Sequence, residues 1–277
     1  MVDDRQGNSG GRPPRRPSAA GAGNRDRWGS NAPRRSGPGR ARPAQPRQAS
    51  GDDSSATQAG PVLPPSIEAK QLAPEIRGEL STLDRSTADT VARHLVAAGE
   101  LLDEDPQAAL EHAQAARARS GRIAAVREAV GIAAYQCGDW AQALSEFRAA
   151  RRMGSKSQLL PLIADCERGV GRPERAIELA RSPEAAELTG DDADELRIVA
   201  AGARADLGQL EQALVVLSTP QPDPSRTGST AARLFYAYAE TLLALDRGED
   251  ALQWFIHAAA ADVDGVTDAE DRVGELA

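Results

Sequence analysis

Apolar positions divide the chain into two parts. Residues 1–60 are mainly Gly, Pro, Ser, Arg and Ala, with hardly a bulky aliphatic side chain among them. A segment of this kind buries too little apolar surface to offset the entropy lost on ordering, and its prolines disfavour helix. We therefore expect a disordered arm over residues 1–60 and a folded domain over residues 61–277.

The folded part shows helical spacing from its beginning. Leu72, Ile76 and Leu80 lie at i, i+4 and i+8, a pattern that predicts a helix over 71–83. Helix-period segments then follow one another, separated by short turns that carry Gly, Asp or Pro. The last segment predicts a closing helix over 267–276, with Thr267 or Asp268 as its N-cap. Aromatic residues make up only 3% of the chain while alanine and leucine are plentiful, so an all-α fold is favoured.

An internal repeat runs through this part of the chain. Five segments contain a turn residue followed by an alanine and then a leucine or isoleucine. The alanines are Ala109, Ala143, Ala176, Ala213 and Ala251, at spacings of 34, 33, 37 and 38 residues. A period of about 34 residues is that of the tetratricopeptide repeat, which consists of two antiparallel helices.

The chain resembles the tetratricopeptide family most clearly in the segment REAVGIAAYQCGDWAQALSEFRAA. The resemblance implies that Gly131 lets two helices approach closely, that Gly138 ends the first helix and that Trp140 packs over the turn. It also implies a packed face on the second helix, formed by Ala143, Phe147 and Ala150. The third and fourth units depart from the pattern, because Pro183 and Pro220 predict second helices that end early, near Ala180 and Leu217.

The fold implied by this resemblance is a right-handed α-solenoid of about five stacked antiparallel helix pairs, with capping helices over 71–83 and 267–276. In such a solenoid the first helix of each pair lines a concave face that binds another protein. The implied partner-binding residues are His94, Glu128, Ile132, Tyr135, Gln136, Asp165, Arg168, Tyr236 and Glu240. A basic or apolar segment of a partner protein would suit this mixed apolar and acidic face. The alternative is that these side chains are solvated, or that the two tyrosines pack between adjacent pairs.

Charge is unevenly distributed along the chain. Residues 1–60 carry eleven arginines, five aspartates and neither lysine nor glutamate, for a net charge of +6, whereas residues 61–277 carry −14. Arginine-rich arms bind RNA or DNA without sequence preference through the phosphates. The candidate contacts are Arg12, Arg15, Arg16, Arg34, Arg35, Arg40 and Arg42. The alternative is an unconstrained linker in a protein of a high-GC bacterium such as an actinobacterium, since GC-rich coding raises both arginine and proline.

Residues arranged for catalysis are not evident. The three histidines, His94, His112 and His257, are expected to be dispersed over three units, and the sequence contains neither an H-E-x-x-H nor a phosphate-loop motif. Cys137 and Cys166 lie 29 residues apart without a CxxC motif, which predicts free thiols and a reducing, cytoplasmic location. We expect no membrane span, no cofactor, no metal and no enzymatic activity. The sequence favours a protein–protein interaction scaffold; the alternative is a nucleic-acid-associated factor that acts through its arm.

Overall fold

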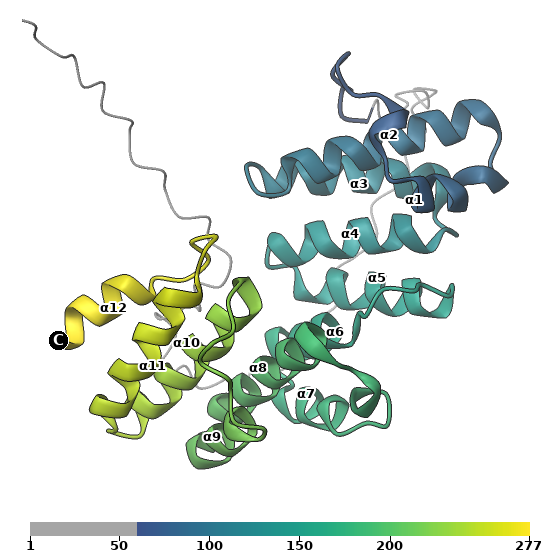
Figure 1. The fold of residues 1–277 in the computed structure, drawn as a ribbon. Helices are drawn as coiled ribbons and strands as arrows, with labels where there is room; N and C mark the ends of the chain where they lie inside the picture. The colour runs from purple at the N-terminus through teal and green to yellow at the C-terminus, as the bar shows by residue number, and fades with distance from the viewer. Residues whose placement is uncertain (1–59) are drawn as a thin grey trace, which may run out of the picture. The chain divides into compact units, whose positions relative to one another are not determined.

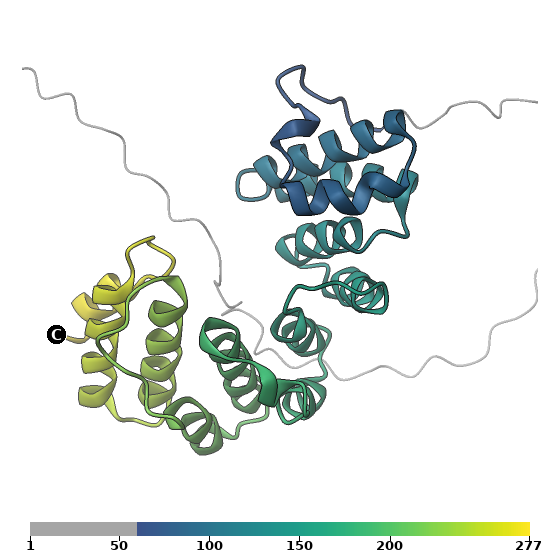
Figure 2. The same ribbon diagram turned by 45° about the vertical axis from the view of Figure 1, so that its right-hand side comes forward.

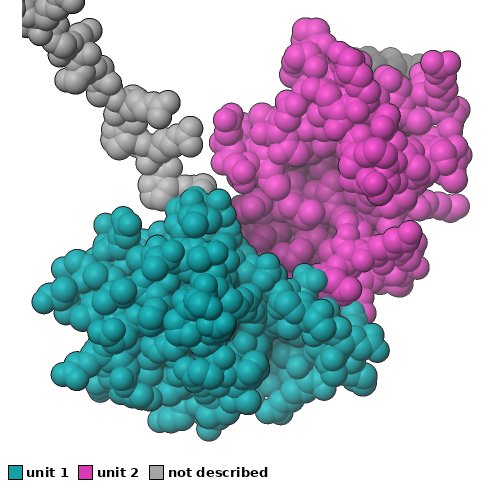
Figure 3. Space-filling model, in the orientation of Figure 1, with its two compact units in different colours: residues 1–21, 172–277 teal, residues 22–171 magenta. Residues whose placement is uncertain are grey.

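The computed structural model describes residues 60–277, in which every regular element is helical (Figure 1). The predicted arm, apart from Gly60, and its candidate nucleic-acid contacts Arg12, Arg15, Arg16, Arg34, Arg35, Arg40 and Arg42 lie outside the described residues. The described chain divides into two compact units, residues 60–171 and 172–277 (Figure 3). This division falls inside the third predicted helix pair, and a single repeat domain over 61–277 stays a prediction.

Residues 60–171 contain two 3₁₀ turns and six α-helices. They are η1 (Ala69–Gln71), α1 (Pro74–Glu79), η2 (Leu80–Thr82), α2 (Arg85–Leu101), α3 (Pro106–Ser120), α4 (Ala124–Gln136), α5 (Trp140–Arg152) and α6 (Leu160–Gly169). Residues 172–277 contain α7 (Pro173–Ala180), η3 (Ala185–Glu187), α8 (Gly190–Asp206), α9 (Leu210–Ser218), α10 (Ser229–Ala244), α11 (Gly248–Ala261) and α12 (Ala269–Leu276).

Within each unit, each α-helix from α2 onward packs against the one that follows it in sequence (Figures 1 and 2). The helix pairs α2/α3 and α4/α5 stack in the first unit, and α8/α9 and α10/α11 stack in the second. Short connections between neighbouring helices make the two members of each pair antiparallel. The predicted all-helical fold of stacked antiparallel helix pairs is confirmed within each unit.

The repeated alanines lie where the helices of a pair meet. Ala109, Ala143, Ala176, Ala213 and Ala251 are each 0% exposed. Phe147 and Phe255, which follow two of these alanines by one turn, are also 0% exposed. A methyl group at one position and a ring one turn later fill the space between two closely spaced helices, which explains why the repeat appears as Ala followed by a bulky residue.

Two glycines allow aromatic rings to pack directly against a helix backbone. A Cβ atom on Gly131 would lie 2.6 Å from Cε1 of Phe147, and one on Gly169 would lie 2.5 Å from Cγ of Trp140. The role predicted for Gly131 is therefore confirmed. Trp140 packs against α6 at Gly169, and its ring also meets that of Tyr135 edge-on, with the ring centroids 5.0 Å apart.

The turns that follow α4, α6, α8 and α10 share one backbone conformation. The residue five positions before the buried alanine has a positive φ in each: Gly138 at 72°, Gly171 at 79°, Gly208 at 72° and Asp246 at 58°. In three of these turns the next backbone N–H bonds to a carbonyl five residues earlier, as in Arg247 to Leu242 at 3.0 Å. This is the Schellman arrangement that ends a helix, and it favours glycine because a side chain strains the left-handed conformation.

We expect Asp246→Gly to raise the free energy of unfolding by about 0.5 kcal/mol. Relief of the left-handed strain on a residue with a side chain is worth roughly 1 kcal/mol, and the larger conformational freedom of glycine in the unfolded chain offsets part of it. Urea denaturation followed by circular dichroism measures the change. The reciprocal substitution Gly208→Asp places the same side chain in the equivalent turn and should lower stability. Equal signs for the two variants would contradict this interpretation of the turn.

The start of the folded part differs from its prediction. Instead of one helix over 71–83, the chain forms η1, the six-residue α1 and η2. Pro74 accounts for the interruption, since it lacks the N–H that a helix continuing from η1 would need, and it stands at the first turn of α1 instead. The apolar stripe is nevertheless buried, with Leu72 at 8% and Leu80 at 2% exposure. Arg93 holds this segment on α2 through the carbonyl of Ile67, with Nε 2.9 Å from the oxygen.

The other predicted helix ends agree with the structure. α7 ends at Ala180 and α9 at Ser218, one residue beyond Leu217. The closing helix α12 follows Asp268, the predicted N-cap position, although the side chain of Asp268 makes no capping hydrogen bond. Thr267 instead donates through its N–H and its hydroxyl to Asp262, at 2.7 Å each.

Candidate partner-binding surface

The first helices α4 and α6 carry most of the predicted partner-binding residues in the unit of residues 60–171. On α4, Ile132 and Tyr135 are half-buried and Gln136 is exposed. Glu128, also half-buried, accepts a hydrogen bond from the Ser157 hydroxyl, 2.8 Å from its Oε2, so it already connects α4 to the segment before α6. This side of α4 therefore presents an apolar side chain and an amide to solvent, beside a carboxylate that already accepts one hydrogen bond.

Tyr135 lies at the centre of a polar cluster between α4 and α6. Its hydroxyl donates to Oδ2 of Asp165, and Oδ1 of Asp165 lies 3.2 Å from Nη1 of Arg168. Burial, together with the nearby Asp165 carboxylate, raises the pKa of Tyr135, so the phenol stays protonated and remains a donor. The structure thus brings three predicted site residues together, and it uses them to join two successive first helices.

A second cluster of this kind lies between α10 and α12, in the unit of residues 172–277. Glu240 on α10 accepts from Arg272 on α12, with Nε 3.1 Å from its Oε1, and the Arg272 guanidinium lies 5.3 Å from the centroid of the Phe255 ring. The Tyr236 ring packs edge-on against the same phenylalanine at 5.3 Å. Burial, with the carboxylates of Asp268 and Glu240 nearby, raises the pKa of Tyr236. These two predicted residues also act as contacts between helices.

His94 does not lie on an accessible face. It is 3% exposed between α2 and α3, where its Nδ1 is 3.0 Å from Nδ1 of His112. The expectation that the three histidines are dispersed is wrong for this pair, because α2 and α3 belong to the same helix pair and bring residues 94 and 112 together. Burial, the neighbouring His112 and two arginines lower the pKa of His94 to about 4, so the pair is neutral at neutral pH.

Three buried carboxylates were not predicted from the sequence. Glu146 and Glu167 are each 3% exposed and Asp194 is 6% exposed. Glu146 on α5 binds Arg117 on α3 and Arg127 on α4, and Glu167 on α6 binds Arg148 on α5. The signal was present in the repeat itself, since Glu146 lies on the packed face one turn after Ala143 and directly before Phe147.

Asp194 shows the same arrangement in the other unit. It binds Arg197 at 2.7 Å and also Arg226, which approaches from the loop after α9. Arg197 reaches further, and its Nη2 lies 2.7 Å from the carbonyl oxygen of Pro220. Together these contacts close the end of α9, where Pro220 stops the helix early. A buried carboxylate flanked by arginines here is a structural element, because each charge is satisfied within the chain.

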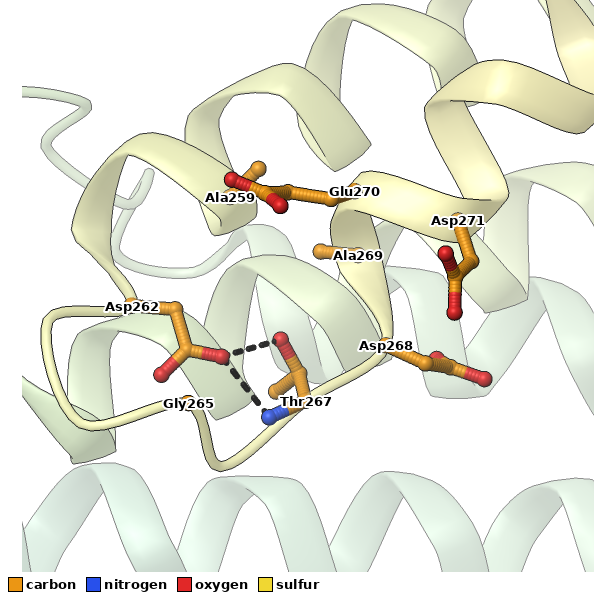
Figure 4. A pocket seen from close by; sticks show the side chains of 8 residues that line it. All are labelled: Ala259, Asp262, Gly265, Thr267, Asp268, Ala269, Glu270 and Asp271. Carbon is orange, nitrogen blue, oxygen red and sulfur yellow. Dashed lines mark hydrogen bonds between the residues drawn. The ribbon is translucent and has the colours of Figure 1, made fainter. Parts of the chain in front are cut away.

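A hollow of about 220 Å³ lies at the beginning of α12 and is lined largely by acidic residues (Figure 4). The Asp262 carboxylate points across the hollow to Thr267, because it accepts the two hydrogen bonds from Thr267 described above. Burial alone would raise the pKa of Asp262, but the hydrogen bonds from Thr267 and Val266 outweigh it and lower that pKa. In residues 60–277 no group of three or more His, Cys, Asp or Glu side chains is arranged to hold a metal ion.

The two cysteines are free, in agreement with the prediction. Cys166 is buried in α6, and burial there raises the pKa of its thiol to about 12. Cys137 ends α4 and is half-buried. Among the helices that the structure describes, none is both long and apolar enough to span a membrane.

Stacked helix pairs whose first helices are joined by polar clusters define a helical-repeat protein. No protein-family model matches the sequence, and no curated protein matches it either. A solved structure that is similar is the crystal structure of YrrB, described as a TPR protein with an unusual peptide-binding site. It is 20% identical, the match covers 70% of this chain and 95% of that chain, and the TM-score is 0.43.

Proposed function

We propose that this protein is an interaction scaffold that binds a partner polypeptide on the first-helix face of its repeats. The observation that carries the proposal is the face of α4, where Ile132 and Gln136 border the Tyr135–Asp165–Arg168 cluster. The cluster holds α4 and α6 in one arrangement before a partner arrives, and a surface ordered in advance loses less entropy on binding. Repeat folds of this kind characteristically bind through their extended surfaces.

Charge favours a basic or apolar segment as the partner. Residues 172–277 contain nine arginines and 21 carboxylates, for a net charge of −12, whereas residues 60–171 carry −2. A field of this sign speeds the association of basic segments and slows that of acidic ones. In this proposal five of the predicted residues both contribute to the partner-binding face and hold the helices together: Tyr135, Asp165, Arg168, Tyr236 and Glu240. His94 is left out because it is buried.

The test is a pair of charge-matched variants of the full chain. Glu128→Lys with Gln136→Lys alters the first-helix face of α4, and Gln107→Lys with Glu111→Lys makes the same change on exposed positions of the second helix α3. We expect proteins captured by the wild-type chain from its native lysate to be lost at least about tenfold with the α4 variant, because like charges repel a basic partner. The α3 variant should retain them.

Truncating either tyrosine is a poorer test, because Tyr135→Ala also removes contacts with Asp165 and Trp140 and would weaken the fold. Equal thermal unfolding of the two lysine variants, measured by circular dichroism, keeps folding and binding separate. Capture of the same proteins by the α4 variant, the α3 variant and the wild type would contradict the assignment of this face.

A further inference from the structure

The helix α12 carries an arginine that residues of two other helices hold. Arg272 lies over the Phe255 ring of α11, and its Nε and Nη2 are each 3.1 Å from Oε1 of Glu240 on α10. Its Nη1 binds Glu275 of α12 itself, and its side chain is only 14% exposed. Tyr236, one turn before Glu240, packs edge-on against Phe255. We call Tyr236, Glu240 and Phe255 the arginine site.

The arginine site matches a guanidinium group better than an ammonium group. A planar guanidinium presents two N–H donors to one carboxylate while its face lies over an aromatic ring, whereas a lysine ammonium is a compact and strongly hydrated charge. Cation–π attraction is strongest where water is excluded, and Phe255 is 0% exposed. The net charge of −12 on residues 172–277 also attracts cations from solvent. The site therefore has the chemistry to select an arginine side chain.

The helix α12 is weakly anchored compared with the helices that form the site. Of its eight residues, all of which the structure describes, Ala269 alone is buried, whereas α10 buries eight residues. Its first turn has no side-chain cap, and Gly274 lies inside it, where glycine destabilises a helix relative to alanine. Segments with few buried contacts open locally at a lower free energy than the core. We therefore expect α12 to leave the arginine site while α10 and α11 stay packed.

We propose that the arginine site receives an arginine of the partner polypeptide when α12 moves away, so that α12 is a built-in competitor for the partner. The inference rests on the proposed function in taking the ligand to be a polypeptide, and it adds the side chain that is recognised and the element that regulates recognition. The incoming arginine repeats the contacts of Arg272 with Glu240 and Phe255. The apparent affinity is reduced to the fraction of molecules in which α12 has left the site.

The test measures binding of the full chain to a fluorescein-labelled pentapeptide, Ala-Val-Arg-Val-Ala, by fluorescence anisotropy. Arg272→Gln removes the competing arginine and should bind the peptide at least about tenfold more tightly than wild type. Its control, Arg247→Gln, removes the same charge from an exposed ion pair with Asp250 and should stay within about twofold of wild type. Adding Glu240→Gln to Arg272→Gln should abolish the gain. A peptide with lysine in place of arginine should show no gain either.

A second pair of variants changes α12 and leaves the arginine site intact. A Cβ on Gly274 would meet nothing within 4 Å, so substitutions there act through the helix itself. Gly274→Pro breaks α12 and should tighten peptide binding at least about fivefold. Gly274→Ala favours the helix and should weaken binding at least about twofold. Because the site residues are unchanged, these two variants decide the question if Arg272→Gln is found by circular dichroism to be poorly folded.

Any of four results would overturn the inference. Absence of peptide binding by both Arg272→Gln and Gly274→Pro would show that α10 and α11 form no arginine site. Equal affinities for wild type and these two variants, or changes of the same sign for the two Gly274 variants, would show that α12 does not compete. An equal gain with Arg247→Gln would assign the effect to net charge. An equal gain with the lysine peptide would show that the site does not select a guanidinium.

This readout is separate from the test of the proposed function. The lysine substitutions on α4 lie in the unit of residues 60–171, whereas the arginine site lies entirely in the unit of residues 172–277. Loss of the peptide effects with retained capture dependence on α4 would overturn only the arginine site. Retained peptide effects without that dependence would overturn only the assignment of the α4 face.

Discussion

Replacing Gly131 by valine should lower the free energy of unfolding by about 3 kcal/mol. The Cβ of any side chain at this position would lie within 2.6 Å of the Phe147 ring, which is itself 0% exposed and has no room to turn. Insertion of atoms into a packed core forces shifts that cost about 1 to 3 kcal/mol, and β-branching adds to the cost because it restricts the rotamers available against the ring. Urea denaturation monitored by circular dichroism gives the value.

Gly99 supplies the matched control for this substitution. It is also a helical glycine, exposed on α2, and a Cβ there meets nothing within 4 Å. Gly99→Val should change stability by less than about 0.5 kcal/mol. Phe147→Leu, introduced together with Gly131→Val, should recover at least about 1 kcal/mol relative to the sum of the single changes, since a leucine can move away. Additive losses would show that the ring does not limit position 131.

Acidification from pH 7 to pH 5 should destabilise the protein by about 2 kcal/mol through the histidine pair alone. Folded His94 has a pKa of about 4, whereas an unfolded histidine titrates near 6.5. Between these values the unfolded chain binds more protons than the folded chain. The contribution of neutral His94 to the free energy of unfolding is therefore present above pH 6.5 and is lost as pH falls towards 4. Burial also lowers the pKa of His112, although Glu111 opposes this, and Arg119 and Arg93 lower that of His94 further.

The variant His94→Leu with His112→Leu tests this expectation. It replaces both partners of a buried hydrogen bond by apolar side chains of similar size, which can be nearly neutral at pH 7. Thermal unfolding at pH 7, 6 and 5 should then show a smaller loss than the wild type shows. His112→Leu alone should be less stable than the double variant at pH 7, because it leaves the Nδ1 of His94 buried without its partner. Parallel pH profiles for wild type and double variant would rule out the histidine pair as the source.

The sequence predicted the repeat well because the repeat is a local pattern. Ala143, Phe147 and Gly138 have their roles determined by the helix pair in which they lie, so spacing alone reveals them. The interruption of the first predicted helix was also a local signal, since Pro74 stands three residues after the start of the predicted span.

The candidate site was harder to predict, because it depends on contacts between residues far apart in sequence. Tyr135 is 30 residues from Asp165, and His94 is 18 residues from His112. A tyrosine on a first helix looks the same in sequence whether it faces a partner or donates to the next helix. The burial of the side chain distinguishes these two cases, and that burial depends on how successive helix pairs are stacked.

Glu146 takes one arginine from its own helix pair and one from the pair before it, which limits how this protein can evolve or be redesigned. A pair cannot be deleted, duplicated or exchanged at this junction without leaving a desolvated carboxylate or a stranded guanidinium behind. Although the helix pairs look alike in sequence, they are therefore not interchangeable modules. Changes in the length of the array should be tolerated only where a neighbouring charge is altered at the same time.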